Sequence, residues 1–360
     1  MNLDYAGKKP KEEILTKATS LSKSIKNTGN SLLIKGDNFI ALSALLPNYT
    51  GKIDLIYIDP PFNTNQTFTV EDGRVSTISR KKSSTVAYSD QMKPYEYIEF
   101  IRERLILLRE LLSDRGSIYL HIDTKMGHYV KIIMDEIFGI DNFKNDITRI
   151  KSNPKNFTRR AYGNQKDVIY FYAKNKDKNI FNNVTIQLNE NEKAKMFKKV
   201  DEIGRRYNTV PAHAPGETNG KTGGKWRGVL PPSGRHWRTD PSELDKLDNL
   251  GLIEWSKNGV PRIKKFADEH KGKKIQDIWN YIDPVYPLYP TEKNLKMLEM
   301  IVEQSSNKNS IILDCFAGSG STLLAAENLG RKWIGIDQSD VSHKTIEKRF
   351  AKSFYEYFEL

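Results

Sequence analysis

A short apolar run that ends in Asp59-Pro60-Pro61-Phe62 constrains the fold of this chain more than any other feature. The run at 53–58, Ile-Asp-Leu-Ile-Tyr-Ile, is rich in β-branched residues, which predicts a buried strand of a parallel sheet. Residues at the carboxyl ends of such strands line the crevice in which open α/β sheets bind ligands. We therefore expect Asp59 to face a bound ligand.

The two prolines prepare the same position for hydrogen bonding. Because each proline lacks an N–H, and the first keeps Asp59 out of the helical region, the carbonyls of Asp59 and Pro60 are free to accept hydrogen bonds. A carboxylate, a fixed carbonyl and the ring of Phe62 are suited to hold a planar heterocycle that carries an amino group. Two prolines after a strand also occur as a simple stop signal, so a second motif has to decide between the two interpretations.

That second motif is the nine-residue segment 314–322, Asp-Cys-Phe-Ala-Gly-Ser-Gly-Ser-Thr. It lies between a predicted strand at 310–313 and a predicted helix at 323–329, and a further strand at 333–336 ends in Asp337. Glycines in such a turn let a ligand approach the backbone, and the helix N-terminus offers free N–H groups. Asp337 is placed to accept hydrogen bonds from ribose hydroxyls. This strand–turn–helix–strand segment therefore predicts an adenosine ligand. A dinucleotide is disfavoured, because Leu323 stands where its fingerprint has a third glycine.

With both motifs present, the chain resembles the amino-group DNA methyltransferases that use S-adenosylmethionine. Asp-Pro-Pro-Phe resembles their catalytic motif and Phe-Ala-Gly-Ser-Gly-Ser their cofactor loop, in the order of the β class of these enzymes. The segments Tyr-Pro-Thr-Glu-Lys at 289–293 and Gly-Arg-His-Trp at 234–237 also resemble family signatures. The resemblance covers about residues 30 to 352. Cys315 is one departure, since the family more often has proline there.

The resemblance implies a circularly permuted, Rossmann-like α/β fold of the class I methyltransferases, with a central, mostly parallel sheet. It implies an N-terminal arm or short helix at 1–29, a catalytic half at 30–174, a target-recognition region at 175–285 and a cofactor-binding half at 286–360. Two strands at 145–151 and 167–174 are expected to form a hairpin, and segment 341–352 to lead towards the strand at 31–36.

The site residues follow from the same resemblance. The catalytic residues are expected to be Asp59, Pro60, Pro61 and Phe62. S-adenosylmethionine is expected to be bound by Asp37, Phe316, Ala317, Gly318, Ser319, Gly320, Ser321, Thr322, Asp337, Thr291 and Lys293. Asp37 also reads as a helix N-cap.

Two segments are expected to contact double-stranded DNA. The polar segment 63–91 follows the catalytic residues directly and is predicted to be a mobile loop that closes on DNA. In the region 175–285, cations alternate with aromatic residues, as suits phosphate and base contacts. The expected DNA-binding residues are Arg80, Lys81, Lys82, Lys225, Trp226, Arg227, Arg235, His236, Trp237 and Arg238.

The predicted reaction is methyl transfer to the N6 amino group of a flipped adenine. N4-cytosine methylation remains the alternative, and an aspartate at the first catalytic position favours adenine in this family. An RNA methyltransferase, a nicotinamide-dependent oxidoreductase and a catalytically inactive DNA-binding protein are weaker alternatives. A homodimer and a cognate restriction endonuclease are further expected partners.

Bulk composition agrees with a nucleic-acid partner. The 360-residue chain has a net charge of +12, and its isoelectric point of about 9.3 favours a polyanionic partner. A single cysteine excludes a disulfide framework and a thiolate zinc site, and no metal is expected. No signal peptide and no run long enough to span a membrane are visible, so we expect a cytoplasmic protein without a membrane partner.

Overall fold

The computed structural model describes residues 2–360 except 22, 62–66, 72–73, 77–84, 90–91, 155–159, 285–286, 288 and 290–291, together with the side chains of 67–71, 74–76 and 85–89. The chain divides into two compact units. Unit 1 comprises Met1–Val184 and Gln276–Leu360, and unit 2 comprises Thr185–Ile275. Among the helices described in both units, none is long and apolar enough to cross a membrane.

A mixed sheet forms the centre of unit 1. Its nine described strands lie side by side in the order β17 (Ile278–Asn280), β7 (Phe143–Ile150), β8 (Lys166–Ala173), β6 (Leu112–Ile122), β2 (Ile53–Ile58), β18 (Ile311–Asp314), β19 (Lys332–Asp337), β1 (Leu32–Lys35) and β20 (Glu356–Glu359). Neighbouring strands are parallel except where β8 pairs with β6 and with β7. Every residue of β2 is buried, as predicted for a central strand of a parallel sheet.

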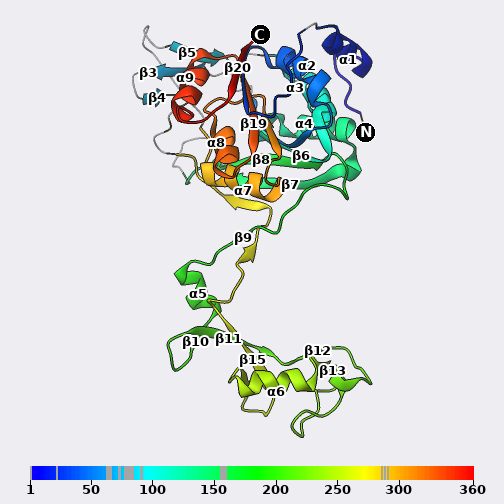
Figure 1. Ribbon diagram of the computed structural model, residues 1–360, viewed down its shortest axis with the longest axis vertical. Coiled ribbons are helices and arrows are strands. Elements are labelled where there is room, and N and C mark those ends of the chain that lie inside the picture. Colours follow the sequence, from blue (N-terminus) through cyan, green and yellow to red (C-terminus); the bar gives the residue numbers. More distant parts are fainter. Residues whose placement is uncertain are drawn as a thin grey trace. The chain divides into compact units, whose positions relative to one another are not determined.

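Helices cover this sheet in two groups, which Figure 1 shows on its two sides. One group is α2 (Asn38–Tyr49), α3 (Pro94–Leu111) and α4 (Thr124–Phe138), with α1 (Lys11–Ser20) beside them. The other is α7 (Leu295–Ser305), α8 (Ser321–Asn328) and α9 (Asp340–Arg349). The first group buries its apolar stripes in one continuous core with the strands, and the short 3-10 turn Ile140–Asn142 follows α4.

The predicted fold class is confirmed. The strand that ends in the Asp-Pro-Pro-Phe motif, the two strands of the predicted cofactor unit and the two strands of the β7–β8 hairpin all lie in one α/β sheet. The permutation is visible in β1, whose two neighbours, β19 and β20, both come from the end of the chain. The helix at 11–20 settles the open prediction for residues 1–29 in favour of a short helix over that range.

The segment 63–91 contains regular structure that the sequence did not reveal. Three short strands, β3 (Thr67–Glu71), β4 (Arg74–Ser76) and β5 (Thr85–Ser89), pair in antiparallel fashion with β3 in the middle. A loop without strands is therefore an incomplete description of this segment. Its mobility and its contact with DNA stay predictions.

Unit 2 has a small core of its own and lies within the predicted insertion 175–285. Its elements form a four-stranded sheet, two pairs of strands and two helices: β10 (Lys199–Val200), β11 (Arg206–Pro211), β15 (Pro261–Phe266), β14 (Ile253–Trp255), β12 (His213–Pro215), β13 (Arg235–Trp237), β9 (Thr185–Ile186), β16 (Lys273–Lys274), α5 (Glu190–Met196) and α6 (Pro241–Asn249), with a 3-10 turn at Lys221–Gly223. Its proposed role in target recognition stays a prediction.

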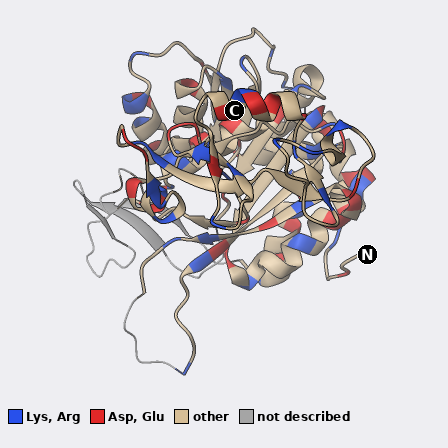
Figure 2. Cartoon of the chain, turned by 90° about the horizontal axis from the view of Figure 1, so that it is seen from below, with Lys and Arg blue, Asp and Glu red and all other residues tan. Residues whose placement is uncertain are grey.

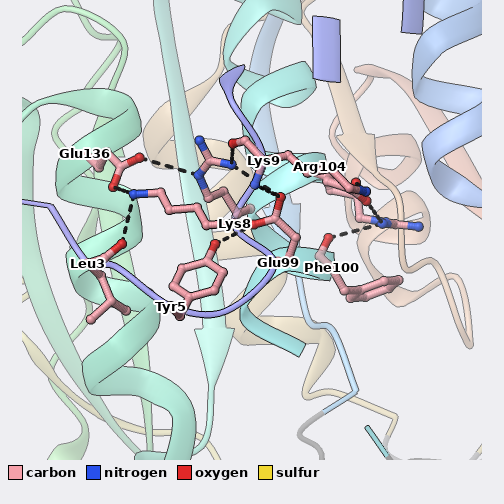
Figure 3. Close-up of polar contacts among 10 residues, drawn as sticks. Leu3, Tyr5, Lys8, Lys9, Glu99, Phe100, Arg104 and Glu136 are labelled. Carbon is pink, nitrogen blue, oxygen red and sulfur yellow. Dashed lines mark hydrogen bonds and ion pairs between the residues drawn. The ribbon is translucent and has the colours of Figure 1, made fainter. Parts of the chain in front are cut away.

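A network of buried charges fastens the N-terminal segment to helices α3 and α4 (Figure 3). The Tyr5 hydroxyl donates to Glu99, and the ammonium groups of Lys8 and Lys9 pair with Glu136 and Glu103 at 2.8 and 2.6 Å. Arg102, whose side chain is only 4% exposed, pairs with both Glu99 and Glu136 and donates to the Lys9 carbonyl. Carboxylates buried in this way are tolerated because each one has a cation or a donor.

Replacing Arg102 with methionine should therefore destabilise unit 1. The substitution leaves two buried carboxylates without one of their partners, and the expected loss is about 3 kcal/mol of unfolding free energy, since Tyr5 and Lys8 still contact them. Urea denaturation measures this loss. Arg109→Met is the matched control on the same helix, because Arg109 only approaches Glu110 at 3.8 Å near the surface and should cost less than about 1 kcal/mol. Equal losses in both variants would contradict a special role for the network.

Candidate functional site

A cavity of about 400 Å³ opens at the carboxyl ends of β1, β2, β18 and β19. Neighbouring strands β2 and β18 are parallel, and the chain leaves them towards helices of opposite groups, so this is the point where an open α/β sheet binds its ligand. The cavity is large enough for a ligand of ordinary cofactor size. It brings both predicted motifs together: its walls include Asp59, Pro60, Pro61, the turn from Phe316 to Ser319, Ser321, Thr322 and Asp337.

The turn after β18 is held in a conformation that only glycine adopts readily. Gly318 and Gly320 have φ values of +50° and +73°. The Gly318 N–H donates to the Asp337 carboxylate at 2.8 Å, and the Gly318 carbonyl accepts from Ser342 at 2.6 Å. A Cβ on Gly320 would lie 2.8 Å from Ile346, so the turn also needs glycine for packing against α9.

Asp337 therefore has a structural task in addition to the ligand contact predicted for it. One carboxylate oxygen accepts from Gly318 and the other from the Ser339 N–H at 2.8 Å. Burial raises the pKa of Asp337, while these two backbone bonds act in the opposite direction. Each oxygen keeps a second lone pair, so a contact with a ribose hydroxyl is still available.

Asp37 and its neighbour Asn38 also line the cavity. Asp37 caps α2 through bonds from Phe39 and Ile40, as the N-cap interpretation predicts, and it also lines the cavity. Arg104 donates to Asp37 at 3.3 Å and to the Asn38 amide oxygen at 2.7 Å, while its guanidinium lies 3.8 Å from the centre of the Phe100 ring.

This arginine links three parts of the wall. Asn38 in turn donates to the Cys315 carbonyl at 3.0 Å, and Phe100 meets Phe316 edge to face. The sequence did not single out Arg104, Asn38 or Phe100, because the contacts join residues far apart in the chain.

The carboxylate of Asp59, which the sequence predicts to be catalytic, has one oxygen in an ion pair and one without a described hydrogen-bond partner. Asp59 Oδ2 pairs with Lys293 Nζ. Asp59 Oδ1 is buried and has no hydrogen-bond partner among the residues that the structure describes. A buried acceptor without a donor is energetically costly, so a hydrogen-bond donor supplied by a ligand would stabilise Oδ1.

Behind Asp59, a buried histidine belongs to a second polar network. His121 Nδ1 lies 3.6 Å from Asp59 Oδ1, too far for a hydrogen bond, and is instead bonded to the Tyr57 hydroxyl at 2.9 Å. Its Nε2 is 3.3 Å from Asp167, which also pairs with Lys151 at 2.6 Å. Burial lowers the pKa of His121, although Asp59 and Asp167 oppose this effect, so the imidazole is neutral at neutral pH.

Two further buried groups lie at the end of β18. Burial raises the pKa of Asp314 to about 7, and its carboxylate accepts the Phe316 N–H at 3.0 Å and lines the cavity. Burial also raises the pKa of the adjacent Cys315 thiol well above its ordinary value. Cys315 packs in the core with 1% exposure.

Some predicted residues fall outside what the structure describes. Phe62, Thr291, Arg80, Lys81 and Lys82 belong to the undescribed ranges. Lys293, predicted to bind the cofactor, lies on the cavity wall but pairs with Asp59.

In unit 2 the structure separates the predicted DNA-binding residues into two kinds. Lys225, Arg235 and Arg238 are exposed, and His236 bonds the Gly216 carbonyl at 2.8 Å at the surface. By contrast, the other three predicted residues use their polar groups in contacts within unit 2.

Trp226 and Trp237 are 2% and 0% exposed in the core of unit 2, and their indole N–H groups donate to Asp245 and the Gly224 carbonyl. Arg227 pairs with Asp245 and Asp248. Base stacking by either indole therefore has no support in this geometry. Lys and Arg residues occur on many elements of the chain (Figure 2), so net charge alone does not locate a DNA-binding face.

Comparisons with known proteins identify the family. A family model described as DNA methylase, for the N6/N4 enzymes, matches residues 53–348. The type II methyltransferase M.EcaI of Enterobacter cloacae is 40% identical, over 98% of this chain and 78% of that protein. The Mod subunit of the type III restriction-modification enzyme StyLTI of Salmonella typhimurium is 26% identical, over 96% of this chain and 59% of that protein.

Solved structures give weaker matches. The M1.HpyAVI-SAM complex has a TM-score of 0.46 and 19% identity, covering 88% of this chain and 99% of that one. PvuII DNA methyltransferase, described as cytosine-N4-specific, has a TM-score of 0.48 and 12% identity, covering 93% and 96%. On the family and sequence matches, the chain belongs to the N6/N4 amino-group DNA methylase family, whose members are S-adenosylmethionine-dependent and serve restriction-modification systems.

The residues of the cavity fit that cofactor. The turn at Gly318 and Gly320 lets a ligand approach the backbone, and Asp337 offers free lone pairs beside it. Gly320→Ala should therefore weaken binding of S-adenosylhomocysteine by tenfold or more, because the added methyl group displaces Ile346 and the turn. Isothermal calorimetry measures this affinity.

Gly330→Ala is the matched control. Gly330 has a φ of +68° at the end of α8, but a Cβ there would meet no described heavy atom within 4 Å. Gly330→Ala therefore shares the backbone strain of Gly320→Ala but not its steric clash. Its affinity should stay within about twofold of wild type. Unchanged affinity in a folded Gly320→Ala protein would show that the turn does not hold the cofactor.

Proposed function

We propose that this enzyme transfers the methyl group of S-adenosylmethionine to the N6 amino group of an adenine flipped out of duplex DNA. The observation that carries the proposal is that Asp59, one of whose carboxylate oxygens has no described hydrogen-bond partner, lines the same cavity as Pro60 and the glycine turn. Aspartate at the first catalytic position supports adenine, while N4-cytosine methylation is the alternative.

The chain's own groups suggest how the amino nitrogen is made reactive. The lone pair of an adenine amino group is delocalised into the ring, so the nitrogen is a poor nucleophile. If Asp59 Oδ1 and the Pro60 carbonyl each accept one N–H, the nitrogen is drawn towards a tetrahedral geometry and its lone pair turns out of the ring plane. S-adenosylmethionine, when bound, supplies the electrophilic methyl group. A duplex base reaches the cavity only after flipping, which costs a few kcal/mol.

Lys293 supports this arrangement from the other side of Asp59. By binding Oδ2, Lys293 fixes the rotation of the carboxylate, while Oδ1 has no hydrogen-bond partner among the described residues. The pair is largely buried, with side-chain exposures of 9% and 15%, so the interaction is only weakly screened by solvent.

The first test of this function concerns Asp59. Asp59→Ala should abolish methyl transfer to DNA while the affinity for S-adenosylhomocysteine stays within about threefold of wild type. Transfer of a tritiated methyl group to DNA measures activity, and mass spectrometry of digested DNA distinguishes N6-methyladenine from N4-methylcytosine.

Asp340→Asn is its control, since Asp340 is an exposed acid at the start of α9 that pairs with Lys35 and does not line the cavity. This variant should keep full activity. Methyl transfer by Asp59→Ala within tenfold of wild type would contradict the assignment.

A second test separates the two roles considered for Lys293. Lys293→Met should lower the rate at saturating cofactor by on the order of 10²-fold, because the catalytic carboxylate is no longer held in place. Lys293→Arg should recover part of that rate. If the variant instead loses affinity for S-adenosylhomocysteine and keeps its maximal rate, Lys293 is a cofactor ligand, as the sequence predicted.

A further inference from the structure

Unit 2 contains arginines of two kinds. Arg205 donates to Asp268 and Glu269 at 2.9 Å, and Arg227 pairs with Asp245 and Asp248. Among the described residues, Arg235, Arg238 and Arg262 have no carboxylate within ion-pair distance. Cations that a fold leaves unpaired are available to an anion from outside.

These three arginines gather around one histidine. Arg235 Nη1 lies 3.3 Å from His213 Nδ1. Burial lowers the pKa of His213, and the charges of Arg235, Arg238 and Arg262 lower it further. The imidazole is therefore neutral at neutral pH and does not add to the repulsion among the three guanidinium groups.

Two of the guanidinium groups are held in place by the same stretch of backbone. Arg262 donates from Nε to the Thr209 hydroxyl and from Nη2 to the Thr209 carbonyl, both at 2.8 Å. Arg238 donates from Nε to the Pro211 carbonyl at 2.9 Å. Because the strand register places Arg262 opposite Pro211, both side chains flank residues 209–211.

Each anchored arginine keeps donors to spare. A guanidinium has five N–H groups, so Arg262 retains three and Arg238 four beyond the bonds described. A guanidinium group whose orientation is already fixed loses little conformational entropy when it binds an anion. Its planar N–H geometry also matches the oxygens of a phosphate. The backbone carbonyls that accept from these two guanidinium groups satisfy some of their N–H donors but do not neutralise their positive charge.

We infer that Arg262, together with Arg235 and Arg238, forms a binding site for a backbone phosphate of duplex DNA. The inference rests on the proposed function, in which duplex DNA is the substrate, and it adds Arg262 to the residues that the sequence pointed to. Arg262 lies on β15, outside the segment rich in cations and aromatic residues, and only the sheet brings it to Arg238.

The test is the salt dependence of DNA binding by the full chain. Fluorescence anisotropy of a labelled duplex of mixed sequence, with S-adenosylhomocysteine present, gives the affinity over a series of NaCl concentrations. Arg262→Gln and Arg238→Gln should each weaken binding to all duplex sequences alike. Each should also flatten the slope of log K against log salt by about 0.9, the amount expected for one phosphate contact.

Arg205→Gln is the matched control, because its guanidinium is already occupied by Asp268 and Glu269. It should leave the slope unchanged. Arg238→Gln guards against a folding effect of Arg262→Gln, since Arg238 is exposed and its side chain bonds a single carbonyl among the described residues.

Unchanged slopes in both test variants, or a loss confined to one base position, would overturn the phosphate site while leaving the proposed function intact. Failure of the proposed function has a different signature: the wild-type protein itself would show no salt-dependent binding to duplex DNA.

Discussion

The parallel pairing of β2 with β18 is the constraint on which the whole site depends. It sets Leu55 beside Ile312 and Ile56 beside Leu313, although more than 250 residues of chain separate these strands. The buried Asp54 reinforces the pairing, because its carboxylate accepts hydrogen bonds from the hydroxyl groups of Ser113 and Ser310. The loops that follow the two strands then have to meet, and they carry Asp59 and the glycine turn.

The sequence predicted the features that local chemistry determines. The buried strand, the prolines and the glycine turn are contiguous in the chain, and their conformational demands are visible from residue type alone. The family resemblance supplied the permuted order. The partners of these groups were not visible in the same way: Lys293 on Asp59, Arg104 on Asp37 and the neutral His121 behind the site are contacts that only the folded sheet creates.

The second unit shows how composition can mislead. Aromatic residues among cations are typical of a nucleic-acid interface, but a small unit also has to build a core, and Trp226 and Trp237 are its largest buried groups. Likewise, an arginine's charge in the sequence does not reveal whether the fold has already supplied its counter-ion. Arg227 is neutralised by α6, whereas Arg262, which no motif marks, is left charged and held by neutral backbone.

Cys315 has a practical consequence that follows from its burial. It is the single cysteine of the chain, it is 1% exposed, and its carbonyl is tied to Asn38 on the cavity wall. A thiol with a raised pKa in such a place reacts with alkylating reagents only when the surrounding structure opens. The alkylation rate of Cys315 in the wild-type protein therefore reports how often the structure around the cofactor turn unfolds locally. A ligand bound at this turn will lower that rate.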